Sequence, residues 1–311
     1  PSAPGSAPGV SPPLFNLSVG YTLEGIQSPT MDAFIDGMLK PAGTAVWREA
    51  LAEAATALDS PACLEAFGAD ACRKARNRLA TVPDRPIHSI TLSTMHGCPP
   101  DEIGRIATYL MSVKGANVYV KLNPTLLGFD TARSILDQLG WQRIELAPDN
   151  FAHDLQFPQA LELIASLRAA AAREGVRFGL KLSNTLANRN TTAFLPGSER
   201  YLSGRAVFPL TIQLAARLAE ALPEPLPISF CGGVSASNAG DCLAAGLAPL
   251  TVATDILKPG GCLRLGAIAR LAVAAIPAAP PLPDPTALRR LVDSSLERPE
   301  YRGDWKDGEA R

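Results

Sequence analysis

The sequence predicts an α/β protein whose βα units form a TIM-type (β/α)8 barrel. Short apolar, β-branched runs that end in polar or Gly residues recur along the chain and are typical of buried strands. Amphipathic helical patterns separate most of these runs, at the spacing of roughly 25 to 35 residues that parallel βα units require. No Gly-rich GxGxxG turn follows the early strands. A closed barrel is therefore favoured over an open doubly wound sheet.

The expected strands share β-branched or apolar cores and turn residues at their ends. They cover residues 15–19, 87–93, 118–122, 143–146, 178–182, 226–231 and 250–253. The expected helices cover residues 31–39, 100–113, 131–139, 159–173, 210–222 and 237–245. In the second of these helices, Ile103, Ile106 and Leu110 follow helical spacing behind a proline in the first turn.

Composition shifts divide the chain. The first thirteen residues, PSAPGSAPGVSPP, resemble a Pro/Gly/Ser linker, and with the initial Pro they indicate a piece of a longer polypeptide. We expect the barrel to span residues 14–276, with a helical, Ala-rich insertion at 41–85 that packs on its outside or covers it. Residues 277–311 are expected to form a Pro-rich connector and a polar C-terminal tail, with one short amphipathic turn.

Charge and cysteine usage exclude several classes of protein. The 311 residues carry 29 basic and 30 acidic side chains without a basic cluster among aromatic residues, which argues against binding to nucleic acid or to an anionic membrane. The longest apolar run, residues 265–276, is interrupted by Arg270 and is too short to cross a bilayer. The six cysteines form no CxxC pair, so we expect reduced thiols and no metal site. The absence of a secretory leader predicts a cytoplasmic location.

The sequence of one strand end occurs twice in the chain. The stretch VYVKLNPTLLG at 118–128 returns as FGLKLSNTLAN at 178–188. We expect Lys121 and Lys181 near the carboxyl ends of two barrel strands, with the strand at 143–146 between them; in a barrel this face carries the chemistry. A lysine there can neutralise charge on a cofactor or form a Schiff base, whereas the alternative is a lysine that fills the end layer with its head in solvent.

A second strand end, ITLSTMHGCPP at 90–100, displays Thr94, His96 and Cys98 just before a helix start. A helix start can lower the pKa of a thiol and can hold an anion. The alternative is a tight βα turn with a satisfied histidine and an inert cysteine.

The last two expected strands end in FCGGVSASNAG and VATDILKPGG. A double glycine after one strand and a hydroxyl after the next are typical of the phosphate site of barrels, in which backbone N–H groups hold the anion. Gly232, Gly233 and Thr254 are the candidates, and the alternative is two ordinary glycine turns.

In this order, TLSTMHG, VYVKLNPT, KLSNT, FCGG and VATDIL resemble the FMN barrel of the dihydroorotate and dihydropyrimidine dehydrogenase superfamily, and within it the selenate reductase iron-sulfur subunit family. The resemblance runs from about Phe15 to Gly266. It implies an FMN across the barrel mouth, with Lys121 beside the pyrimidine ring of the flavin. The family's first strands would lie upstream of Phe15, so the barrel is expected to lack them in this chain.

The resemblance also assigns the remaining site residues. Those implied to contact the flavin are Lys121, Asn184, Thr185, Ser203, Gly204, Gly232, Gly233 and Thr254. Thr22 and Thr91 stand where the family has its substrate-binding asparagines, a departure that argues against pyrimidine reduction, and Asn123 and Lys181 are the further substrate candidates. Thr94 occupies the position of the family's general-acid cysteine and is a far poorer proton donor, so Cys98 and His96 are further catalytic candidates.

These expectations point to a flavin-dependent oxidoreductase that passes hydride or electrons between FMN and a small substrate or an electron-transfer domain or subunit. The resemblance implies iron-sulfur clusters and an FAD/NAD(P)H module, both outside this chain. Two alternatives stay open: a degenerate barrel that serves as a scaffold in a redox complex, and a Schiff-base lyase that uses Lys121 or Lys181.

Overall fold

The computed structural model describes residues 15–93, 96–192, 196–274 and 282–304. The chain forms two compact units, Pro1–Ile90 and Thr91–Arg311. The predicted linker at 1–13, Thr94 and part of the expected connector and tail lie outside the described residues.

Unit 1 carries the strands and helices that precede Thr91. Its elements are β1 (Phe15–Val19), α1 (Leu23–Ile26), α2 (Pro29–Leu39), η1 (Pro41–Gly43), α3 (Ala45–Leu58), α4 (Pro61–Phe67), α5 (Ala69–Leu79) and most of β2 (Ile87–Ser93). β1 lies beside β2, and the Asn16 amide donates to the Ser89 hydroxyl at 2.8 Å. The hydroxyls of Thr44 and Ser60 cap the first turns of α3 and α4, which explains where these two helices begin.

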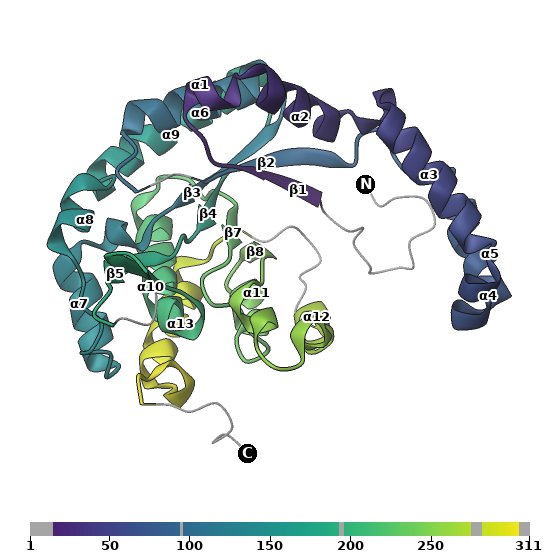
Figure 1. Cartoon of the computed structure of the whole chain (residues 1–311). Coiled ribbons are helices and arrows are strands. Elements are labelled where there is room, and N and C mark those ends of the chain that lie inside the picture. Colours follow the sequence, from purple (N-terminus) through teal and green to yellow (C-terminus); the bar gives the residue numbers. More distant parts are fainter. Residues whose placement is uncertain (1–14, 94–95, 193–195, 275–281, 305–311) are drawn as a thin grey trace. The chain divides into compact units, whose positions relative to one another are not determined.

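Unit 2 is built on four parallel strands that lie in chain order. They are β3 (Asn117–Leu122), β4 (Phe178–Leu182), β7 (Ile228–Phe230) and β8 (Leu247–Leu250). The helices that follow or precede them are α6 (Pro100–Ser112), α7 (Phe129–Gln138), α8 (Pro148–His153), α9 (Phe157–Glu174), α10 (Phe208–Ala221), α11 (Ala239–Ala244), α12 (Arg264–Ala274) and α13 (Pro285–Glu297). α6 and α9 pack together beside β3 and β4 (Figure 1), and α10 also packs against β4. Strand and helix therefore alternate as predicted.

The core of unit 2 lies between this sheet and its helices. Leu180 and Leu182 of β4 and Ile228 and Phe230 of β7 are almost completely buried. The apolar stripe of α6, which includes Ile106, faces the same core. Strands buried on both faces are typical of parallel sheets covered by helices.

The strand predicted at 143–146 does not form. The guanidinium group of Arg133 donates to the carbonyls of Trp141 and Ile144, and Ile144 N donates to Trp141 O at 3.0 Å, which closes a turn. These bonds use carbonyls that a strand would need for its neighbours. β3 and β4 are consequently direct neighbours, and the expectation of an intervening strand was wrong.

The expected C-terminal tail also differs, because the single amphipathic turn is a complete helix. α13 begins behind Asp284, whose carboxylate accepts from Thr286 N at 2.9 Å, and it packs along α10. Leu288 and Leu291 are buried in this contact. The helix is followed by the short turn η6 (Pro299–Tyr301), in which Tyr301 is buried.

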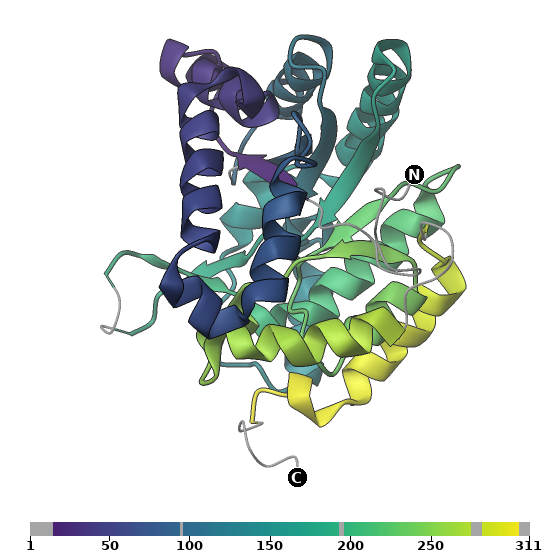
Figure 2. The ribbon, with the colours of Figure 1, turned by 90° about the vertical axis from the view of Figure 1, so that its right-hand side faces the viewer.

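Two further features of unit 2 were not predicted. β8 begins three residues earlier than expected, although Thr251 N still pairs with Phe230 O at 2.8 Å. An antiparallel hairpin of β5 (Leu186–Arg189) and β6 (Glu199–Leu202) follows β4 and projects from the strands in Figure 2.

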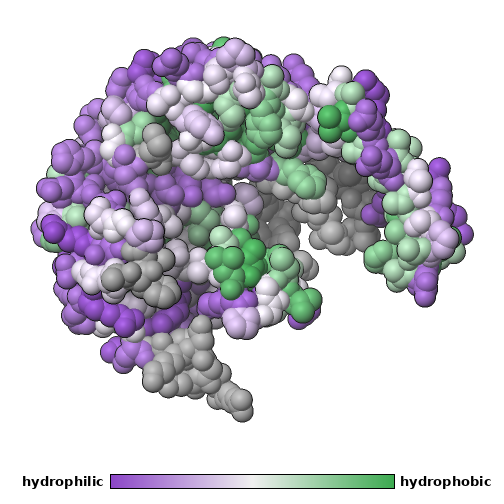
Figure 3. All heavy atoms as spheres, viewed as in Figure 1, coloured by the Kyte–Doolittle hydropathy of each residue, from purple (hydrophilic) through white to green (hydrophobic). Residues whose placement is uncertain are grey.

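The surface beyond β8 is partly apolar. Leu257 and Leu263, in η4 (Thr254–Leu257) and η5 (Gly261–Leu263), are 84% and 87% exposed, and Leu271 of α12 is half exposed. Figure 3 shows apolar side chains at the surface around α12. In the part of the chain that the structure describes, every helix is too short or too polar to span a bilayer.

Candidate functional site

The two repeated lysines lie side by side at the carboxyl ends of their strands. Lys121 of β3 is the register partner of Lys181 of β4. The Lys181 ammonium donates to the Thr251 hydroxyl, just beyond β8, at 3.2 Å. Burial lowers the pKa of Lys181, Cys231 acts in the opposite direction, and the positive charge of Lys121 lowers the pKa further. The pair therefore concentrates positive charge at the edge where the strands end.

Cys231 completes this edge and was missed by the sequence analysis. Its backbone N–H donates to Leu182 O at 2.6 Å and its thiol donates to Ser183 O at 3.1 Å. Burial raises the pKa of Cys231 despite the two lysines nearby, so the thiol stays neutral near pH 7. Asn184 is held at the same edge because its backbone N–H donates to Leu122 O at 2.9 Å.

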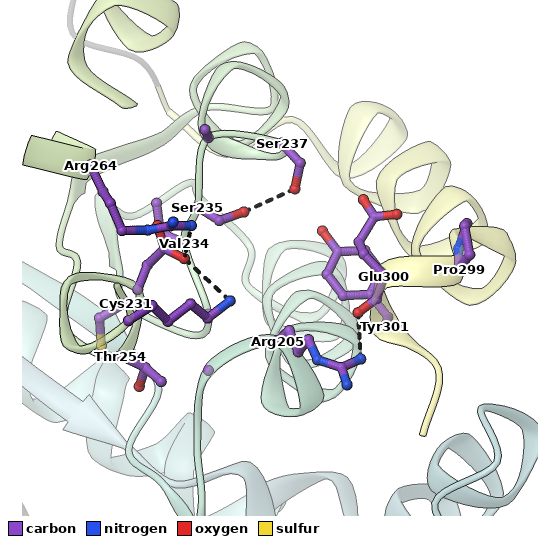
Figure 4. Close-up of a pocket in the computed structure, with 15 residues that line it drawn as sticks. Arg205, Cys231, Val234, Ser235, Ser237, Thr254, Arg264, Pro299, Glu300 and Tyr301 are labelled. Carbon is purple, nitrogen blue, oxygen red and sulfur yellow. Dashed lines mark hydrogen bonds and ion pairs between the residues drawn. The ribbon is translucent and has the colours of Figure 1, made fainter. Parts of the chain in front are cut away.

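A cavity of about 370 Å³ opens beside this edge. Five segments of unit 2 line it: the start of η3 (Gly204–Val207), the loop after β7, η4, the start of α12 and η6 (Figure 4). The predicted residues Gly204, Gly233 and Thr254 are in its wall, together with Cys231. Three strand ends that are far apart in the sequence thus meet at one cavity.

The wall of the cavity is a close contact of backbone segments that only glycine permits. Gly233 has a φ of +79°, and a Cβ added to it would lie 2.3 Å from the Gly204 carbonyl oxygen. Gly204 has a φ of +65°, and its Cβ would lie 2.8 Å from Cγ2 of Thr254. The Thr254 hydroxyl in turn donates to the Ser203 hydroxyl at 3.3 Å. In this cradle, formed by Ser203, Gly204, Gly233 and Thr254, the loop after β7, the start of η3 and the start of η4 pack directly against one another.

Gly232, the first glycine of the pair, packs against the interior of the fold. A Cβ on Gly232 would lie 2.4 Å from the Thr211 hydroxyl oxygen, inside the fold. That hydroxyl shares a hydrogen bond of 2.7 Å with Ser183, which follows β4. Gly232 therefore allows the loop to approach α10 and does not line the cavity.

The cavity is lined by three basic and two acidic side chains. Arg264 donates to both oxygens of the buried Asp255, at 3.0 and 3.1 Å, and Lys258 lies 3.5 Å from the same carboxylate. Arg205 donates to the carbonyl of Glu300 at 2.7 Å (Figure 4). The glycine cradle and the excess of basic side chains suit an anion such as a phosphate group.

A second cluster, around the carboxylate of Asp154, brings two predicted residues together. Asp154 accepts from His96 Nδ1 at 2.8 Å, Gly97 N at 2.6 Å, the Thr125 hydroxyl at 2.8 Å and the Asn123 amide at 3.1 Å. Its side chain is only 2% exposed. The carboxylate joins the segment after β2 to the segment after β3.

The electrostatics of this cluster favour an ion pair. Burial alone would raise the pKa of Asp154, but the hydrogen bonds from His96, Gly97 and Thr125 outweigh it and lower the pKa. The hydrogen bond to Asp154 raises the pKa of His96 against the effect of its own burial. The side-chain oxygen of Asn123 is buried without a hydrogen-bond partner among the described residues.

The structure also describes four further predicted residues, Cys98, Thr91, Thr185 and Thr22. Burial, Glu102 and Asp101 raise the pKa of Cys98, which disfavours the thiolate that a helix start can stabilise. Thr91 is buried within β2, and Thr185 is half-buried after β4. Thr22 belongs to unit 1, where its hydroxyl caps α1 by accepting from Gly25 N at 3.1 Å. Among the described residues, His, Cys, Asp and Glu side chains form no group that could hold a metal ion.

Comparison with known proteins agrees with the fold and with the class of protein. Residues 9–302 match the family described as "Oxidoreductase YgfK, N-terminal TIM-barrel domain". The protein named "Putative oxidoreductase YgfK" of Escherichia coli (strain K12) is 46% identical over 261 residues, which are 83% of this chain and 25% of that protein. A protein of the same name from Escherichia coli O157:H7 gives the same values. The chain thus spans about a quarter of the length of these curated relatives.

A weaker similarity reaches a characterised class of enzyme. The dihydroorotate dehydrogenase (quinone) of Coxiella burnetii (strain Dugway 5J108-111) is 29% identical over 120 residues, 38% of this chain and 32% of that enzyme. The predicted α/β barrel class is confirmed by the family match. The chain belongs to the family of the N-terminal TIM-barrel domain of the oxidoreductase YgfK.

Proposed function

We propose that this chain is the FMN-binding domain of an oxidoreductase, with the phosphate of the cofactor in the glycine cradle of Ser203, Gly204, Gly233 and Thr254. The observation that carries the proposal is that Gly204, Gly233 and Thr254 line one cavity of about 370 Å³ together with the basic side chain of Arg205. Arg264 and Lys258 add positive charge to the same cavity.

The lysine pair is suited to bind the flavin ring, at the end of FMN opposite the phosphate. Lys121 and Lys181 stand together at the carboxyl ends of β3 and β4, and Asn184 is held to the end of β3. A cation at this edge stabilises negative charge that develops nearby, and an amide can both donate to and accept from a heterocycle. FMN, when bound, supplies or accepts two electrons together with hydrogen. The lysines and Asn184 would orient the ring and exclude water.

The substrate class follows from the relatives. The dihydroorotate dehydrogenase similarity supports a small substrate with a polarised double bond. Since the chain spans a quarter of its relatives, we propose that the electron-transfer partner is another domain or subunit of the same redox protein.

A titration with FMN and with riboflavin tests the cradle directly. FMN should bind, and the fluorescence of the flavin should be quenched on binding. Riboflavin, which lacks the phosphate, should bind at least tenfold more weakly. Gly233→Ala should abolish the difference between the two ligands, because its Cβ collides with the Gly204 carbonyl. Gly175→Ala is the matched control: its φ of +66° imposes the same backbone strain, but no atom lies within 4 Å of the added Cβ.

Equal affinity for FMN and riboflavin in the unaltered protein would refute the phosphate assignment.

A second candidate, a Schiff-base lyase, is favoured by the burial and lowered pKa of Lys181 beside Lys121. Borohydride trapping separates the two activities. Covalent attachment of a carbonyl substrate to Lys181, found by peptide mass, would support the lyase over the flavin domain.

A further inference from the structure

The His96–Asp154 cluster offers a proton-exchanging group at the carboxyl ends of β2 and β3. Every hydrogen bond between His96 and the described residues uses Nδ1. The side chain is 27% exposed, so the ring is partly open to solvent, and its second nitrogen, Nε2, takes no part in these hydrogen bonds. Tyr201 of β6 stacks on the ring at a centroid distance of 6.2 Å. The imidazole is thus held from one edge and one face.

Asp154 determines which nitrogen of His96 is available. A buried carboxylate that accepts from Nδ1–H fixes the tautomer and the orientation of the ring and stabilises the imidazolium form. Asp154 is itself held by Gly97 N, Thr125 and Asn123, so it cannot turn away. Glu199, also on β6, is the further charged group that stabilises the imidazolium.

Redox chemistry on a small substrate needs such a group. Transfer of a hydride to one atom of a polarised double bond leaves a negative charge on the other atom, which must be protonated, and a side chain with a pKa near neutrality does this best. The hydroxyl of a threonine is a poor donor. The raised pKa of Cys98 makes its thiol a weaker acid than an ordinary cysteine. His96 is the better acid.

We propose that His96 exchanges, through Nε2, the proton that accompanies each two-electron step at this site, with Asp154 as its positioning residue. The inference rests on the proposed flavin chemistry. In substrate reduction the reduced flavin would supply a hydride to one atom of the double bond, the Nε2–H bond breaks, and its electron pair stays on the imidazole. The proton forms a bond to the substrate atom that has become negative. The neutral ring then regains a proton from solvent, and substrate oxidation reverses each transfer.

The test is the midpoint potential of FMN bound to the full chain, measured from pH 5 to pH 9 without substrate. Reduction of FMN adds negative charge to the site and should therefore raise the pKa of His96. At pH values between the pKa of His96 in the oxidised protein and its pKa in the reduced protein, His96 should take up a proton when FMN is reduced. Within that range the potential should fall more steeply, by about 30 mV per pH unit for one extra proton and two electrons. His96→Gln should remove the steeper range, and Asp154→Asn should move it to lower pH.

His153→Gln is the matched control, because His153 is exposed and bonds only to the carbonyl of Asp149 on its own helix. FMN stoichiometry is measured for each variant beforehand. Superimposed potentials for the unaltered protein and His96→Gln, both loaded with FMN, would overturn the role of His96 alone. Failure of the unaltered protein to bind FMN would overturn the proposed function, and this inference with it.

Discussion

Asp154 shows how much of the site depends on one carboxylate. It accepts four hydrogen bonds from the segments after β2 and β3, and none of its neighbours in the sequence marks it as special. The lysines and glycines could be found from the sequence because they stand in strand ends with recognisable wording. Asp154 lies between α8 and α9, in a connection whose path the sequence did not reveal. Long-range polar contacts of this kind require the three-dimensional structure.

The His96–Asp154 ion pair should make stability depend on pH. The raised pKa of His96 means that its contribution is fully present below the ordinary histidine pKa of about 6.5 and is lost as the pH rises through the raised value. The lowered pKa of Asp154 means that its contribution is present above the ordinary aspartate range and is lost as the pH falls through the lowered value. Asp154→Asn should therefore lower the Tm more at pH 5.5 than at pH 8.5.

Thermal unfolding of both proteins at the two pH values checks this expectation. Asp149→Asn is the control, since Asp149 lies on the adjacent helix α8 and its side chain is outside the cluster. An equal loss of Tm at both pH values would show that Asp154 acts only through its bonds to Gly97, Thr125 and Asn123, which do not titrate.

At the scale of elements, hydrophobic pattern and turn residues predicted most of unit 2. β4 and α6 were predicted within one residue of their observed ends, because buried β-branched runs and a proline-led amphipathic helix carry strong local signals. The segment 143–146 has the same local pattern as a strand, and the bonds from Arg133 on α7 decide otherwise. The direct pairing of Lys121 with Lys181 follows from that tertiary effect.

α13 is a complete helix where the sequence predicted a single amphipathic turn. We expect it to stabilise the fold. Leu288 is fully buried against α10. Leu288→Ala should lower the free energy of unfolding by about 2–5 kcal/mol, the usual cost of removing a buried leucine side chain. Leu271→Ala, on the exposed surface of α12, should change it by less than about 0.5 kcal/mol. Urea unfolding followed by circular dichroism measures both, and equal effects would show that α13 is not part of the core.

At the scale of the molecule, the fold explains why residues from distant parts of the sequence can act together. The parallel strands β3, β4, β7 and β8 end on one edge, which therefore carries the lysine pair on β3 and β4, Cys231 after β7 and Thr254 after β8. Neither the hairpin β5–β6 nor the turn η6 was predicted, because their positions depend on contacts such as the stacking of Tyr301 on Phe208 at 4.8 Å. The sequence therefore predicted the barrel class, whereas the surroundings of the cavity depend on tertiary contacts that local patterns do not carry.

The curated relatives are longer proteins than this chain. The family match covers 9–302, and the curated relatives are about four times as long as the matched segment. The apolar surface at Leu257, Leu263 and Leu271 is present on unit 2 beside the cavity. In the function that we propose, the role of this domain within a longer protein depends first on FMN binding.

The visible absorption spectrum of the purified chain, before and after FMN is added to the apo form, tests the central claim most directly. We predict a flavin band that stays with the protein through gel filtration, with release of one FMN per chain on denaturation. The absence of a band, together with the absence of FMN binding to the apo form, would contradict the flavin assignment and leave the non-catalytic scaffold as the better account of this fold.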